Sequence, residues 1–157
     1  MMETSSIAKG IEALDAMCKA AGVEPKLHQA ISKGKYIIVI AGPVGEVESS
    51  LAKGAEIAGN TLVARHIIRN VHAGALAALN KKIRPAAIEA VGIVETKEAL
   101  PALFAADAAA KAAFVHVAEV NTGKGIGGKG YFTVNGEVGA VRTAVAAGVK
   151  AIGEDAV

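Results

Sequence analysis

Residues 15–21 read Asp-Ala-Met-Cys-Lys-Ala-Ala, and residues 107–113 read Asp-Ala-Ala-Ala-Lys-Ala-Ala. The offset is 92 residues (from 15 to 107), and the same offset relates Glu3-Thr4 to Glu95-Thr96. Separate motifs that recur at one spacing are typical of a duplicated unit. We therefore predict that this chain contains two copies of one small unit.

Further along the chain the offset becomes 94, because Gly34-Lys35 matches Gly128-Lys129 (from 34 to 128). The new register is kept at several glycine and valine pairs: Gly42/Gly136, Val44/Val138, Gly45/Gly139, Val47/Val141, Gly54/Gly148 and Gly59/Gly153. The change predicts a two-residue insertion between Val115 and Gly128, within a glycine-rich stretch. A single insertion in a loop is expected when two duplicated copies diverge in sequence.

Each copy predicts the order helix, strand, strand, helix. The first helix follows Thr4-Ser5-Ser6, which can cap it. Its apolar positions are Ile7, Ile11, Leu14, Met17 or Cys18, and Ala21, and those of its counterpart after Thr96 are Leu100, Leu103 and Phe104. Strands are expected at 24–31 and 35–41, and again at 114–120 and 130–134. The closing helices have apolar residues at Val44, Val47, Leu51, Ala55 and Ala58, and at Val138, Val141, Val145, Val149 and Ile152.

These elements predict an α/β (α+β) fold with a small antiparallel sheet in each copy and helices on one side. Gly59 and Gly153 are expected to stop the closing helices. The ends of the copies do not match: a strand is predicted at 88–94 before the second copy and another at 60–71 after the first. We therefore expect domains at 1–82, without its opening strand, and 86–157, without its closing strand, joined by a polar linker at 80–85.

The composition excludes several classes of protein. Hydrophobic residues are 52% of the chain, yet none of its stretches has the roughly 18 apolar residues that a membrane span needs. The N-terminus does not resemble a signal peptide, so an intracellular, soluble protein without membrane contact is expected. The 17 basic and 15 acidic residues form no basic stripe, and aromatics are only 3%, which weighs against nucleic-acid binding. The single cysteine, Cys18, is predicted to be a small buried side chain.

Four stretches of the second copy together resemble the bacterial microcompartment domain: residues 92–96 (Gly-Ile-Val-Glu-Thr), 105–112 (Ala-Ala-Asp-Ala-Ala-Ala-Lys-Ala), 127–129 (Gly-Gly-Lys) and 136–141 (Gly-Glu-Val-Gly-Ala-Val). The first copy has matching stretches at 3–10, 15–21 and 34–36, and residues 68–72 are similar to the closing strand of this family. The whole chain resembles a tandem-domain shell protein, most of all the subtype of propanediol-utilising compartments.

The resemblance implies a structural shell protein of the bacterial cytoplasm, not an enzyme. It implies a homotrimer that forms a six-sided, pseudohexameric disc and tiles with other shell proteins, both hexamers and pentamers, around encapsulated enzymes. Lys19 and Lys111 match lysines at the tile edges. The turns at Ser32, Lys33 and Gly34 and at Gly125, Ile126, Gly127 and Gly128 match the residues that line the central pore. In related tandem proteins a cysteine in the first turn can hold an iron–sulfur cluster, but Ser32 stands at that position here, so no cofactor and no metal are expected.

The glycine-rich loop from Gly123 to Lys129 offers an alternative function, in which a small oligomeric ligand-binding or regulatory protein binds phosphate or nucleotide there. Its glycines fit both G-x-G-x-x-G and most of a P-loop. Both motifs need a helix directly after the glycines, whereas residues 131–134 predict a strand, and Gly130 replaces the Ser or Thr of a P-loop. The histidines at 28, 66, 72 and 116 have no metal-ligand spacing, and no residues are predicted to be catalytic.

Overall fold

The computed structural model describes residues 1–157, which divide into two compact units. Unit 1 is Met1–Arg69 and unit 2 is Asn70–Val157. Residues 70–82, which the sequence analysis assigned to the first domain, therefore lie in unit 2.

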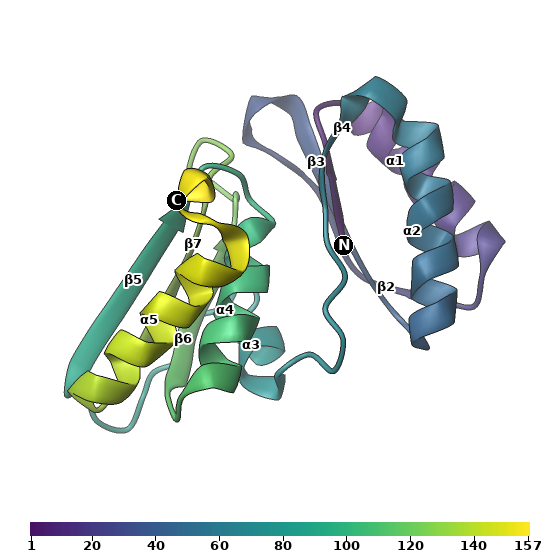
Figure 1. The fold of residues 1–157 in the computed structure, drawn as a ribbon. Coiled ribbons are helices and arrows are strands. Elements are labelled where there is room, and N and C mark those ends of the chain that lie inside the picture. Colours follow the sequence, from purple (N-terminus) through teal and green to yellow (C-terminus); the bar gives the residue numbers. More distant parts are fainter. The chain divides into compact units, whose positions relative to one another are not determined.

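Unit 1 is a four-stranded antiparallel sheet with two helices on one face (Figure 1). Its strands occur in the order β2-β3-β1-β4 across the sheet. The elements are β1 (Met2–Thr4), α1 (Ile7–Ala20), β2 (Glu24–Ile31), β3 (Lys35–Ala41), α2 (Val44–Ala58) and β4 (Leu62–Arg65), with short 3-10 turns at Ser32–Gly34 and Gly59–Thr61.

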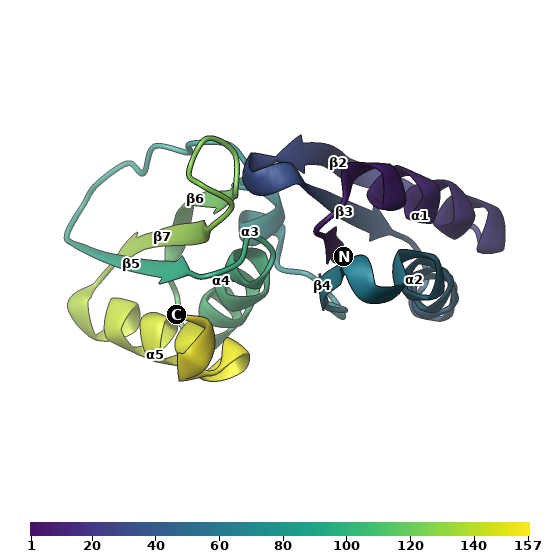
Figure 2. The same ribbon diagram turned by 90° about the horizontal axis from the view of Figure 1, so that it is seen from above.

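Unit 2 repeats this plan with a three-stranded antiparallel sheet in the order β5-β7-β6, whose one face is covered by α4 and α5 (Figure 2). The elements are α3 (Ala73–Ala77), β5 (Ala90–Thr96), α4 (Pro101–Ala112), β6 (His116–Thr122), β7 (Gly130–Gly136) and α5 (Val138–Ile152), followed by a 3-10 turn at Glu154–Ala156. The segment before β5 extends this sheet, because the Asn80 and Ile83 amides donate to the carbonyls of Val120 and Ala118, each at 2.7 Å.

The predicted order helix, strand, strand, helix is confirmed in both units. Unit 1 also has a strand where none was expected: β1 is only three residues long, and it pairs with both β3 and β4. The strand predicted at 60–71 is shorter than expected and covers Leu62–Arg65. In unit 2, residues 153–157 after α5 form no strand.

The strand register locates the predicted insertion. Ala30 faces Tyr36 in unit 1, and their equivalents Thr122 and Gly130 face each other in unit 2. Five residues (31–35) connect the first pair and seven (123–129) connect the second. Both hairpins also have a bulge at the same place, between Pro25 and Leu27 and between Val117 and Glu119. The insertion therefore lies in the turn, and the strands keep their pairing.

Small residues form the closest helix contacts. A Cβ built on Gly54 in α2 would lie 2.5 Å from the Met17 sulfur of α1, and one on Gly148 in α5 would lie 3.0 Å from the Ala105 carbonyl of α4. The core face of α1 is therefore formed by Gly10, Ala13 and Met17. The expected apolar stripe was partly wrong: Ile7, Ile11, Val44 and Val138 are exposed. Cys18 is exposed as well, because it follows Met17 by one residue and points about 100° away from it around the helix.

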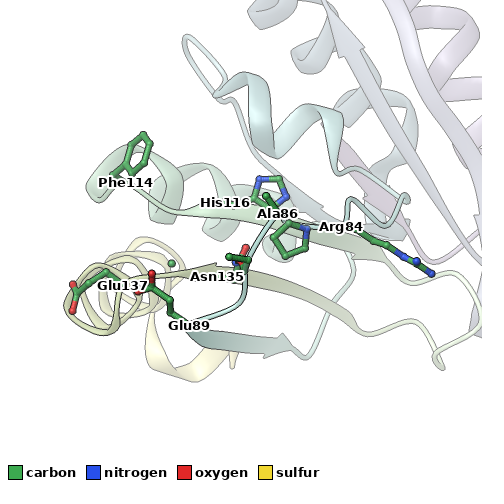
Figure 3. Close-up of a pocket in the computed structure, with 10 residues that line it drawn as sticks. Arg84, Ala86, Glu89, Phe114, His116, Asn135 and Glu137 are labelled. Atoms are coloured by element: carbon green, nitrogen blue, oxygen red, sulfur yellow. The ribbon is translucent and has the colours of Figure 1, made fainter.

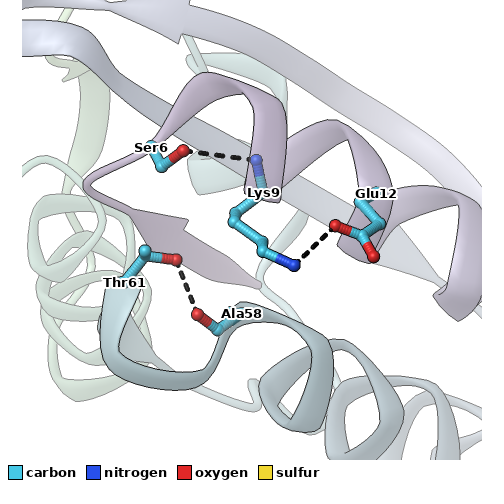
Figure 4. Close-up of polar contacts among 5 residues, drawn as sticks. All are labelled: Ser6, Lys9, Glu12, Ala58 and Thr61. Carbon is cyan, nitrogen blue, oxygen red and sulfur yellow. Dashed lines mark hydrogen bonds and ion pairs between the residues drawn. The ribbon is translucent and has the colours of Figure 1, made fainter.

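The helix ends follow the predicted chemistry in most cases. Ser6 caps α1 by accepting a hydrogen bond from the Lys9 amide at 3.3 Å (Figure 4). Gly59 and Gly153 end α2 and α5 with positive φ of 53° and 82°, and their amides donate to the carbonyls of Ala55 and Val149. Helix α4 has no side-chain cap and begins at Pro101, which has no backbone N–H and so needs no acceptor there.

Candidate functional site

The first predicted pore turn, Ser32–Gly34, is the end of the β2–β3 hairpin. Lys33 has a left-handed backbone with φ of 64°, and Gly34 follows with φ of 69°. Both residues are exposed, and a Cβ on Gly34 would have no atom within 4 Å. The turn therefore presents backbone and one lysine side chain to its surroundings.

The second predicted pore turn lies between β6 and β7 and has four glycines with positive φ: Gly123, Gly125, Gly127 and Gly128. The Asn121 side chain stabilises the start of this turn by accepting a hydrogen bond from the Lys124 amide at 3.2 Å. The residue after the turn starts strand β7, so a strand and not a helix follows the glycines. The turn therefore lacks the geometry of a dinucleotide or P-loop site. The nucleotide-binding alternative is not supported.

A lysine–glutamate ion pair braces the start of the sheet next to each turn. The Lys35 ammonium lies 2.9 Å from a carboxylate oxygen of Glu3, and Lys129 lies 2.6 Å from Glu95. The two pairs are equivalent in the repeat, as each joins the opening strand to the residue that ends the turn. Glu3 is fully buried, whereas both partners of the second pair are exposed. Sequence analysis recorded these residues as repeat markers and missed their pairing.

The two predicted edge lysines occupy the last turns of α1 and α4, where a cation interacts favourably with the helix dipole. Lys19 contacts Asp15 and Lys111 contacts Asp107, each at 2.6 Å. The aspartates differ in burial: Asp15 is exposed, whereas Asp107 is buried and also accepts the His72 amide at 2.7 Å. The equivalence of the two lysines is thus kept, but the partner of Lys111 is buried and has a second hydrogen bond.

Unit 2 also has a cavity of about 450 Å³ that the sequence did not signal (Figure 3). It is lined by residues from the segment before β5 and from the ends of β6 and β7, namely Arg84, Pro85, Ala86, Ala87, Glu89, Phe114, His116, Asn135, Gly136 and Glu137. His116 and Asn135 face each other across the two strands. The Asn135 amide donates to the Ala87 carbonyl at 2.8 Å, whereas its oxygen and His116 Nε2 are buried without a hydrogen-bond partner.

The structure has no group of three or more His, Cys, Asp or Glu side chains positioned to hold a metal ion. None of its helices is long and apolar enough to cross a lipid bilayer. At the start of α5, hydrogen bonds from the Gly139 and Ala140 amides lower the pKa of the Glu137 carboxyl below its ordinary value, which is the effect of a helix cap.

Comparison with known proteins agrees with this geometry. The BMC domain family model matches residues 1–71 and 90–157. The bacterial microcompartment shell protein PduT of Citrobacter freundii is 40% identical over 154 residues, which cover 98% of this chain and 84% of that protein. The carboxysome shell protein CsoS1C of Halothiobacillus neapolitanus is 40% identical over 75 residues, or 46% of this chain and 76% of that protein.

A solved structure matches almost the whole chain. The crystal structure of a microcompartment protein from Desulfitobacterium hafniense DCB is 42% identical and superimposes with a TM-score of 0.83, over 95% of this chain and 83% of that one. The two matched ranges coincide with the two repeats of the sequence and each contains one sheet with its helices. The chain therefore belongs to the BMC domain family, with two such domains in tandem and the structural, non-enzymatic role of a shell protein.

Proposed function

We propose that three copies of this protein form a pseudohexameric disc that tiles into the shell of a microcompartment in the bacterial cytoplasm. Each copy contributes two of the six domains. The observation that carries this proposal is the near-equivalence of the two units in strand register, helix order and bulge position, because a six-sided ring of three chains needs two similar units in each. The 40% identity to PduT over 98% of the chain supports it.

The pore of this disc is formed by the hairpin turns, with Ser32, Lys33 and Gly34 from unit 1 and Gly125–Gly128 from unit 2. Two properties of these turns support the assignment. Four of their seven residues are glycines, and all four have positive φ, a backbone conformation whose N–H groups suit small polar metabolites. Ser32 offers no thiolate and Cys18 lies on α1, so we propose no metal cluster in this pore.

A cross-linking variant tests the pore assignment. In a Cys18→Ser background, Ser32→Cys places three equivalent thiols around the threefold axis of the disc. A short bis-maleimide should then join two subunits, seen as a dimer band on a denaturing gel. Cys18→Ser alone is the control and should stay monomeric on that gel. Trimers that give no cross-linked band would contradict the placement of Ser32 at the axis.

Lys19 and Lys111 form contacts at the edges of the disc. Each has a long apolar stem that can lie along a neighbouring disc while its ammonium binds carbonyl oxygens. Other BMC shell proteins, both hexamers and pentamers, are the proposed neighbours, and encapsulated enzymes lie behind the shell. The two lysines are equivalent in the repeat and stand at the same end of matching helices.

The edge assignment is tested by Lys19→Ala and Lys111→Ala. Both variants should elute as trimers in size-exclusion chromatography but form fewer and smaller sheets in electron microscopy. Lys53→Ala is a matched control, because Lys53 is also an exposed helix lysine with a carboxylate partner, Glu56 at 2.9 Å. Loss of the trimer in either edge variant, or an equal loss of sheets in the control, would contradict the assignment.

A further inference from the structure

Two residues at equivalent positions of the two units have no explanation within the chain. Gly22 follows α1 and Phe114 follows α4, at the offset of 92 residues that relates these helices (from 22 to 114). Their equivalence is also visible in the backbone contacts. A Cβ on Gly42 would lie 3.3 Å from the Gly22 carbonyl, and one on its counterpart Gly136 would lie 3.4 Å from the Phe114 carbonyl.

Phe114 is fully exposed and extends away from the other labelled side chains of unit 2 (Figure 3). The chain has only three phenylalanines, and Phe132 by contrast is completely buried in the core of the same unit. Although Phe114 is among the residues around the cavity, its ring is 101% exposed and buries no surface within unit 2. An exposed aromatic side chain of this kind is a common anchor of protein interfaces.

Gly22 is the reverse case, because nothing in the fold requires a glycine there. Its backbone is not left-handed, and a Cβ at this position would come no closer than 3.8 Å to any atom, the Glu46 carboxylate. The residue is exposed, and its amide donates to Glu46 at 2.8 Å. The missing side chain thus leaves open space at the surface of unit 1, at the place where unit 2 has a phenyl ring.

We infer that the Phe114 ring of one disc packs into the space above Gly22 of a second copy, in a neighbouring disc, so that unit-2 edges meet unit-1 edges. This inference rests on the proposed function, because positions 22 and 114 lie three residues after Lys19 and Lys111 and so share their edges. In a six-sided disc of three two-unit chains the two kinds of edge alternate, and opposite edges are always of different kinds. Discs related by translation alone therefore bring unit-2 edges against unit-1 edges along every shared side, so that Phe114 and Gly22 stand on facing edges.

The alternative pairings bring together surfaces that are less complementary in shape. Two unit-2 edges would place one phenyl ring against another, and two unit-1 edges would leave an unfilled gap. A contact between different surface patches repeats without closing and so extends into a sheet. The Phe114–Gly22 pair thus makes every disc adopt the same orientation in the layer.

The inference is tested with three variants compared with the wild type by light scattering and electron microscopy. Phe114→Gly removes the anchor and should raise the protein concentration at which sheets form by about tenfold, since burial of a phenyl ring supplies roughly that factor. Gly22→Phe should block sheets to a similar or greater extent, because two rings then meet. The double variant Gly22→Phe/Phe114→Gly exchanges ring and space between the edges, and it should recover sheet formation to within about threefold of the wild type.

A cross-link measures the pairing directly. In the Cys18→Ser background, a Gly22→Cys/Phe114→Cys double variant assembled into sheets and oxidised should give chains covalently linked between discs. Phe114→Cys alone should give no such link. Efficient linkage in the single variant would show that like edges pair, and the inference would be wrong.

The outcomes separate this inference from the proposed function. Wild-type protein that forms no sheets would contradict the proposed function and the inference together. Sheets that form equally well with Phe114→Gly, or a double variant that is no better than Gly22→Phe, would contradict the inference alone. Variants that elute as monomers would place Phe114 inside the trimer and would also overturn it.

Discussion

At the scale of single residues, the same contact between a helix and a strand is formed by different residues in the two units. In unit 1, Gly10 of α1 lies against the buried Tyr36, and a Cβ on Gly10 would come within 2.6 Å of that side chain. The equivalent pair in unit 2 is Ala102 and Gly130, so the larger residue has moved from the strand to the helix. A Cβ on Gly130 would lie 2.7 Å from Ala102. In each copy one partner of this contact is a glycine, which lets the helix and the strand approach closely.

We predict that Gly10→Ala destabilises the protein by about 1–3 kcal/mol, because the new methyl group overlaps the Tyr36 side chain. Gly45→Ala is the control, since Gly45 also lies in a helix but has no atom within 4 Å of its Cβ position. That change should stabilise by up to about 1 kcal/mol through helix propensity. Urea unfolding followed by circular dichroism at fixed protein concentration measures both. Equal effects of the two substitutions would contradict this packing.

A second prediction uses the aspartates beside the edge lysines. Asp107→Ala should destabilise by about 1–3 kcal/mol, because it removes a buried carboxylate and leaves the His72 amide without its acceptor. Asp15→Ala at the equivalent position should change stability by less than about 1 kcal/mol, since the Asp15–Lys19 pair is exposed. Thermal unfolding of both variants under one condition makes the comparison. A larger loss for Asp15→Ala would be inconsistent with the described contacts.

At the scale of secondary-structure elements, the sequence predicted most of the fold because helix caps, glycine stops and strand alternation are local signals. The α2 and α5 bounds and the β2 and β3 strands appear where they were expected. The core-facing side of α1 was harder to predict, because Gly10 and Ala13 have little hydrophobic surface. Their small size instead lets neighbouring segments approach the helix closely. The short strand β1 was missed because three residues carry no alternation, and its existence depends on pairing with β3 and β4.

The candidate site divides in the same way. The turns and edge lysines were found because they repeat, and their positions in the sequence are equivalent. The His72–Asp107 hydrogen bond and the cavity beside His116 and Asn135 depend on the segment before β5, residues 70–89, which has no counterpart in the other copy. Contacts of this kind join residues far apart in the chain and leave no periodic pattern.

The cap of α5 leads to a prediction about pH. The pKa of Glu137 is below its ordinary value because the folded backbone donates hydrogen bonds to the carboxylate, first of all from Gly139. A lowered pKa in the folded state means that the cap stabilises the protein above the ordinary glutamate pKa of about 4.3 and is lost as the pH falls through the lower, folded value. The stability difference between wild type and Glu137→Gln should therefore be present at neutral pH and vanish in acid.

The measurement for this prediction is urea unfolding of both proteins between neutral and acidic pH, and Glu56→Gln in α2 provides a comparison with a glutamate outside any helix cap. A gap between wild type and Glu137→Gln that persists or grows as Glu137 becomes protonated would contradict the assigned role of this carboxylate.

At the scale of the whole molecule, the near-equivalent units differ mainly at their surfaces and connections. Their sheets share register and bulges, whereas the turns differ by two residues and the edges differ at Gly22 and Phe114. Because the two units share a fold, the proposed disc has six similar sides. The differences at Gly22 and Phe114 then make unit-1 sides and unit-2 sides prefer different neighbours. This division assigns the cores to folding and the loops and edges to assembly.

Electron microscopy of the purified wild-type protein tests the central claim most directly. We predict six-sided discs with a central opening, each of the mass of three chains, that associate edge to edge into flat sheets as the protein concentration rises. Dispersed monomers or dimers at every concentration would contradict the account of this chain as a self-assembling shell tile.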